Sequence, residues 1–171
     1  MPATGNVKSK INLVLKKQCM KFPVIFILLI VISTGYATSQ NIDSILSQLK
    51  NDQEKADTLF SLSKKYFRKT RFDSAEYVLK KGMVFAEKTG NDELIARYMI
   101  EQGYILFFRE DFKEGLGMLK KSYPYLAKTS ADDLHKKYLL WSGRFYESLN
   151  HNDSALYYYH ECEALNNRVH L

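Results

Sequence analysis

The side chains best suited to chemistry in this 171-residue chain are its four histidines and two cysteines. The only local cluster of metal-ligand types is His160-Glu161-Cys162-Glu163. No histidine is paired with another at i+4, and none completes the Glu-x-x-His pattern of helical metal sites. We therefore expect this cluster to be a solvated helix face with a half-buried cysteine, and we predict no metal and no cofactor.

Other catalytic and phosphate-binding patterns are incomplete. Gly115-Leu116-Gly117 lacks the following Gly-Lys-Ser/Thr of a phosphate loop, and no Gly-x-Ser-x-Gly nucleophile turn occurs. The carboxylate pairs Glu110-Asp111 and Asp132-Asp133 fall at predicted helix ends, where capping and the helix dipole explain them. The chain is therefore predicted not to be an enzyme.

The N-terminal segment has a composition of its own. Residues 1–39 hold five lysines and no acidic residue, and they include the apolar run from Phe22 to Ile32, which small and polar residues follow. A basic start, a short apolar stretch and a small-residue exit are typical of a secretory signal peptide, whereas a spanning helix needs about 20 apolar residues. We predict a signal peptide over residues 1–39, with 1–19 as an upstream extension if Met20 is the natural start.

The predicted cleavage follows Ala37 or Ser39, and the remainder is expected in the periplasm or outside the cell. An uncleaved N-terminal anchor is the alternative, so any membrane contact is expected only through this segment. Of the chain's net charge of +6, the segment carries five units, which leaves +1 for the rest. We therefore expect no nucleic-acid binding. Cys19 also lies in the segment, so Cys162 is left without a disulfide partner.

The remainder shows an internal repeat with a period of about 40 residues, a length typical of repeat proteins. Asp73-Ser74-Ala75 recurs as Asp153-Ser154-Ala155, and Lys80-Lys81 as Lys120-Lys121. Further columns keep one class of residue: Leu59, Met99 and Leu139; Ser63, Gly103 and Gly143; Tyr66, Leu106 and Tyr146; Ala75, Gly115 and Ala155; Leu79, Leu119 and Tyr159. A fixed period of this length predicts a stack of similar units.

Each unit has the pattern of two helices. In the first unit, Leu59, Leu62 and Tyr66 share one helical face, and Asp73 is predicted to cap a second helix. No sustained alternation of polar and apolar residues indicates a strand, so the fold class is all-α. We predict a short leading helix within 40–55 and a repeat domain over 56–171, with units at about 56–91, 92–131 and 132–167.

Small residues recur in both helices of each unit. Ser63, Gly103 or Gly143 in the first helix, and Ala75, Gly115 or Ala155 in the second, are expected to let two helix backbones approach closely. A mid-helix glycine costs about 1 kcal/mol relative to alanine, so glycines at matching positions indicate a packing reason.

The chain resembles the tetratricopeptide (TPR) family at residues spread over all three units: Leu59, Leu62, Tyr66, Phe72, Ala75, Leu79, Gly103, Tyr104, Phe112, Leu119, Gly143, Tyr146, Ala155 and Tyr159. The resemblance implies a right-handed α-solenoid of about three helix-turn-helix repeats. The usual TPR period is shorter, at about 34 residues. The longer period of this chain resembles the arrays of exported bacterial proteins, including ectodomains of sensor kinases and regulators. The closing Pro is absent, Gln102 and Ser142 stand where Leu is expected, and a HEAT-like helical pair is the competing class.

The resemblance also implies a concave groove lined by the first helix of each unit. The implied lining positions are Asp57, Phe60, Lys64, Phe67, Arg68, Arg97, Ile100, Tyr104, Phe107, Phe108, Lys137, Leu140, Arg144, Glu147 and Ser148. As candidates for partner binding we select Lys64, Phe67, Arg68, Arg97, Tyr104, Phe107, Phe108 and Arg144. This mixture suits a peptide with an acidic group or a free carboxylate. The alternative is that several aromatics belong to the core and the cations are merely solvated.

The leading functional hypothesis is an exported, non-enzymatic interaction module that binds a peptide or a partner protein. The alternative is the N-terminal sensory part of a longer TPR-containing signalling protein, a sensor kinase or transcriptional regulator. The latter is suggested because no polar capping helix follows the last repeat. Self-association through that uncapped repeat is a further expectation.

Overall fold

The computed structural model describes residues 42–169, with Val169 described through its backbone alone. The chain divides after Gln48 into two units. In the first unit, residues 42–47 form a short helix, and the predicted signal peptide over 1–39 lies outside the described residues. None of the helices that the structure describes is long and apolar enough to cross a membrane.

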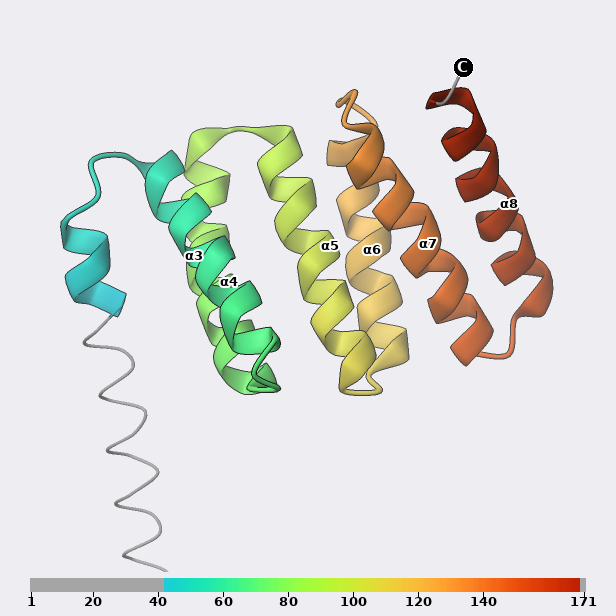
Figure 1. Ribbon diagram of the computed structural model, residues 1–171, viewed down its shortest axis with the longest axis horizontal. Coiled ribbons are helices and arrows are strands. Elements are labelled where there is room, and N and C mark those ends of the chain that lie inside the picture. Colours follow the sequence, from blue (N-terminus) through green and yellow to red (C-terminus); the bar gives the residue numbers. More distant parts are fainter. Residues whose placement is uncertain (1–41, 170–171) are drawn as a thin grey trace, which may run out of the picture. The chain divides into compact units, whose positions relative to one another are not determined.

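The second unit, from Leu49 onward, is a row of three helical hairpins (Figure 1). Within each hairpin the two helices pack against each other along their length. The helices are α3 (Asp52–Phe67) with α4 (Phe72–Thr89), α5 (Asp92–Phe108) with α6 (Phe112–Leu126), and α7 (Asp132–Ser148) with α8 (Asn152–Val169). The predicted all-helical class is thus confirmed for the described residues. The starts of α3, α5 and α7 are separated by one repeat period each, as the sequence predicts.

Neighbouring hairpins are joined through their helices in a regular order. Helix α4 packs on α5, and α6 packs on α7, so the second helix of one hairpin contacts the first helix of the next. The first helices α5 and α7 also contact each other. This consecutive packing defines a helical repeat, in which each hairpin covers an apolar face of its neighbour.

The three hairpin turns have one backbone conformation. Thr70, Glu110 and Asn150, which are equivalent positions in the repeat, have positive φ angles of 56°, 64° and 61°. The residue after each one donates its N–H to a carbonyl in the last turn of the helix before it, as in Arg71 to Tyr66 at 3.1 Å. These are Schellman-type helix ends, which satisfy the last carbonyls of α3, α5 and α7.

The cap predicted for the second helix of the first hairpin is wrong, whereas another residue caps the first. Helix α3 begins at Asp52, and the Asn51 side chain caps it by accepting from the Glu54 N–H at 2.8 Å. Asp73 is not the cap of α4, which begins at Phe72 after Arg71. Instead its carboxylate lies 3.3 Å from Arg109 of the next hairpin, since a first-turn side chain is free to face a neighbouring element.

Small residues permit the close helix packing that the sequence predicts. A Cβ on Gly103 would lie 3.2 Å from the Gly115 carbonyl oxygen, so α5 and α6 approach backbone to backbone there. Between hairpins, Gly82 of α4 leaves room for the ring of Tyr98, which is 1% exposed. The Tyr98 hydroxyl donates to the Ala56 carbonyl oxygen at 2.5 Å, and this bond ties α5 to α3.

Candidate interaction surface

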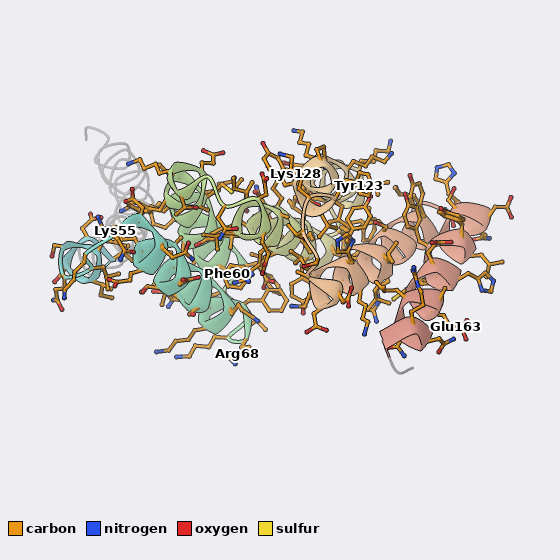
Figure 2. The ribbon with its side chains drawn as sticks, turned by 90° about the horizontal axis from the view of Figure 1, so that it is seen from above. Lys55, Phe60, Arg68, Tyr123, Lys128 and Glu163 are labelled. Carbon is orange, nitrogen blue, oxygen red and sulfur yellow. The ribbon has the colours of Figure 1, made fainter. Side chains whose placement is uncertain are left out.

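The eight predicted binding residues all lie on, or directly after, the first helices of the hairpins. Lys64 and Phe67 belong to α3, Arg68 is its C-terminal cap, and Arg144 belongs to α7. The other four, Arg97, Tyr104, Phe107 and Phe108, belong to α5. Figure 2 shows Arg68 at the outer edge of the molecule. We call the surface formed by α3, α5 and α7 the first-helix face.

Four rings from three helices form a continuous surface, which we call the aromatic strip: Phe67, Tyr104, Phe108 and Trp141. The ring centroids of Phe67 and Tyr104 are 4.6 Å apart, and those of Tyr104 and Trp141 are also 4.6 Å apart. Phe108 contacts Phe67 at 5.1 Å and is 45% exposed, whereas the other three rings are half-buried. The strip therefore combines a fixed, packed base with an accessible apolar edge.

Phe107 supports the strip from the core side. Its ring packs edge-on against Phe112 at 5.4 Å and against the fully buried Phe145 at 5.2 Å. It also contacts Trp141 at 5.1 Å. The structure thus divides the predicted aromatics into a core member and three members of the strip.

Cations flank the strip on both sides. On the α7 side, the Arg144 guanidinium carbon lies 4.8 Å from the Trp141 ring centroid, a distance suited to a cation–π contact. On the α3 side is a segment that we call the basic turn, residues 64–71, in which Lys64, Lys65, Arg68, Lys69 and Arg71 are all exposed. Neither Arg144 nor any of these five makes an ion pair within the part of the chain that the structure describes.

The other end of the first-helix face holds a pocket. It has a volume of about 610 Å³ and is lined by Phe60, Lys64, Glu93, Arg97, Ala131, Asp132, Asp133, Leu134 and Lys137. Its charges offset one another: three lining residues are basic and three are acidic. Arg97 donates to Glu93 at 2.7 Å, so the predicted binding residue Arg97 is already engaged.

A carboxyl group that the groove prediction omitted lies between the two ends of the face. Burial raises the pKa of Glu101, and the charges of Lys64 and Lys137 oppose this rise. Burial also raises the pKa of Tyr104 in the strip, and the Glu101 carboxylate adds to that shift. The half-buried Glu101 carboxyl and the positive charges of Lys64 and Lys137 therefore interact on this part of the face.

Two residues of this face, Glu101 and Trp141, were missing from the sequence prediction. A helical-spacing signal could have found both, because Glu101 follows Arg97 at i+4 and Trp141 follows Lys137 at i+4. They also occupy equivalent positions in two successive units of the repeat. The groove positions implied by the TPR resemblance do not include these two residues, because that resemblance points to other residues of α5 and α7.

Among the described residues, no group of three His, Cys, Asp or Glu side chains is placed to hold a metal ion. Cys162 is half-buried, and its thiol lies 3.7 Å from the Lys136 carbonyl oxygen. What the geometry provides is a surface with an apolar base and charged margins.

The fold and this face together define a class, an all-helical repeat protein with a packed aromatic surface on its first helices. No model of a known protein family matches the chain, and no curated protein matches it.

Proposed function

We propose that the chain is an exported interaction module of TPR-like type that binds a peptide or a partner protein on its first-helix face, without catalysing a reaction. The observation that carries the proposal is the aromatic strip, in which α3, α5 and α7 each contribute at least one ring to one surface. Aromatic side chains are enriched in the cores of protein interfaces, where Trp and Tyr are among the residues that contribute most to binding.

The TPR-like assignment rests on the order of packing. In a right-handed solenoid of helical hairpins, the first helices face one side and form a concave surface. Contacts of α4 with α5, α6 with α7, and α5 with α7 are what such an arrangement requires. The export assignment rests on the basic and apolar composition of residues 1–39.

The proposal is tested by selecting peptides from a random displayed library on the full-length chain and measuring their affinity for variants. Phe108→Ala and Arg144→Glu remove the accessible ring and reverse the cation beside Trp141. The matched control is Lys113→Glu with Lys121→Glu, two exposed lysines of α6.

We expect the selected peptides to bind the control like the parent chain and to lose about tenfold or more with either face variant, because burying half of a phenylalanine ring contributes about 1–1.5 kcal/mol. Peptides that bind every variant equally well, or a library that yields no binder, would show that this face is not an interaction site.

A further inference from the structure

The basic turn makes no ion pair among the residues that the structure describes, unlike several other cations of the chain. Elsewhere, Arg97 pairs with Glu93, Lys128 pairs with Asp92, and Arg109 contacts both Glu76 and Asp73. In the basic turn, five cations fall within residues 64–71, and no acidic residue occurs between Asp57 and Asp73. The repulsion among these cations costs stability that no internal ion pair offsets, so an external anion would stabilise the turn.

The basic turn is continuous with the apolar surface. Phe67 lies within the turn's sequence, and its ring contacts Phe72 at 5.3 Å as well as the Tyr104 and Phe108 rings of α5. Lys64 lies with its Nζ 5.7 Å from the Phe60 ring centroid, and Arg144 lies on the far side of the strip. A ligand on the strip therefore has cations at both margins, and Arg68 and Arg144 make no ion pair among the described residues.

We propose that the aromatic strip and the basic turn together bind an extended acidic peptide segment, in which one or two apolar side chains rest on the strip and carboxylates face the basic turn. The inference rests on the proposed function and specifies its ligand. Arginine pairs well with carboxylates because its guanidinium can donate two parallel hydrogen bonds. Alternate side chains of an extended segment lie about 7 Å apart, so two of them fit across neighbouring rings of the strip.

In this arrangement the acidic residues of the bound peptide lie away from the pocket. There, Glu93, Asp132 and Asp133 would repel a carboxylate, and Arg97 is already paired. The strip end instead has cations without partners among the residues that the structure describes. The ligand is thus expected to depend on Arg68 and Lys69 and to be indifferent to Arg97.

A peptide fits this surface better than an anionic lipid bilayer does. Three of the four rings of the strip are half-buried, and Phe108 alone is exposed enough to enter a membrane interface. The cations lie on two margins of a ring surface that crosses three helices, which suits a chain lying along the surface. Binding to anionic vesicles in place of the peptides would therefore contradict the proposal.

The test uses fluorescein-labelled peptides of about ten residues, long enough in extended form to cross the face. Their termini are blocked so that no terminal carboxylate contributes. The first peptide carries four Glu residues followed by two Leu residues at alternate positions; the second replaces Glu with Gln, and the third replaces Leu with Ser. Fluorescence anisotropy with the full-length chain gives the dissociation constants, and circular dichroism confirms that each variant is folded.

The Glu–Leu peptide is expected to bind, and the Gln and Ser peptides to bind at least about tenfold more weakly. The double variant Arg68→Glu with Lys69→Glu should weaken binding about tenfold at low ionic strength and less at physiological ionic strength, because salt screens exposed charges over about 8–10 Å. Arg97→Gln and the Lys113→Glu/Lys121→Glu control should each change binding less than about twofold.

The remaining outcomes separate this inference from the proposed function. If library peptides depend on Phe108 but the Gln peptide binds as well as the Glu peptide, the face is an interaction site and the acidic ligand is wrong. If vesicles of phosphatidylglycerol bind through Arg68 and Lys69 while none of the peptides binds, the ligand is a lipid surface and the inference is overturned. If neither the Glu–Leu peptide nor any library peptide depends on the face, both proposals fail.

Discussion

The two ends of the first-helix face are built from the same three helices but differ in how their charges and rings are satisfied. At the pocket end, the Tyr98 hydroxyl is bonded to Ala56 and Arg97 is paired with Glu93. At the strip end, Phe108 is exposed and Arg68 has no ion-pair partner among the described residues. Interactions completed within the chain stabilise the fold, whereas incomplete ones are available to a ligand. The pocket end therefore contributes mainly to stability, and the strip end is the part of the face that we propose for ligand binding.

The two ends should differ most in the free energy of unfolding that is lost when one ring at each end is truncated to alanine. Tyr98→Ala should lower the free energy of unfolding by about 3–5 kcal/mol, because it leaves a large cavity in the core between α3, α4 and α5. Phe108→Ala should lower it by only about 1–1.5 kcal/mol, since nearly half of that ring is already in water. Urea unfolding monitored by circular dichroism measures both values. Equal losses would mean that the strip is part of the core and not a free surface.

The Glu101 carboxyl, between the two ends, should make stability depend on pH. Burial raises its pKa in the folded chain, so the folded state holds its proton more tightly than the unfolded state does. Its contribution to stability is therefore greatest at acid pH, below the ordinary carboxyl pKa, and is lost as pH rises through the folded-state pKa.

Glu101→Gln, which carries no charge at any pH, should consequently be more stable than the parent chain near neutral pH by roughly 1 kcal/mol. The difference should vanish in acid, where Glu101 is protonated. Urea unfolding of both proteins across this pH range measures the effect. A variant less stable than the parent at neutral pH would show that attraction to Lys64 and Lys137 outweighs burial.

The repeat in the sequence predicted most of the fold because packing and turn geometry recur with it. Within the predicted unit at about 92–131, helix α5 runs from Asp92 to Phe108, since Asn91 caps its start and a turn residue with positive φ ends it. Burial was less predictable. Leu116 and Leu156 are equivalent in the repeat, but the first is 7% exposed and the second 57%, because only Leu116 has a following hairpin packed on it among the described residues.

The candidate surface was predicted in outline and not in its division into two ends. All eight selected residues lie at the first helices, as the resemblance implies. The ion pair of Arg97 and the burial of Glu101 depend on side-chain geometry across α3, α5 and α7, which a column of residue classes does not contain. The absence of carboxylates from residues 58–72, by contrast, is visible in the sequence and marks the basic turn.

A smaller effect is expected at the basic turn itself. Thr70 is a β-branched residue at a φ of 56°, a conformation that costs an L-residue about 1–2 kcal/mol and a glycine almost nothing. Thr70→Gly should raise the free energy of unfolding by about 0.5–1 kcal/mol, after the entropy cost of glycine is deducted. Asn150→Gly, at the equivalent position of the third hairpin, should gain less because asparagine tolerates this conformation. Thermal unfolding of the two variants measures both gains, and a larger gain for Asn150→Gly than for Thr70→Gly would contradict the prediction.

The smallest expected effect distinguishes Arg97, which forms an ion pair, from Arg68, which forms none among the described residues. Arg97 and Glu93 form an i, i+4 pair on α5 that is partly exposed, and such pairs contribute about 0.3–0.5 kcal/mol. A double-mutant cycle with Arg97→Ala and Glu93→Ala should therefore give a coupling free energy of that size, which decreases in high salt. Arg68 and Glu93 serve as the matched pair without contact, and their cycle should give no coupling within error. Coupling in the second cycle would mean that the basic turn is neutralised by the chain itself, and the distinction between the two ends of the face would no longer hold.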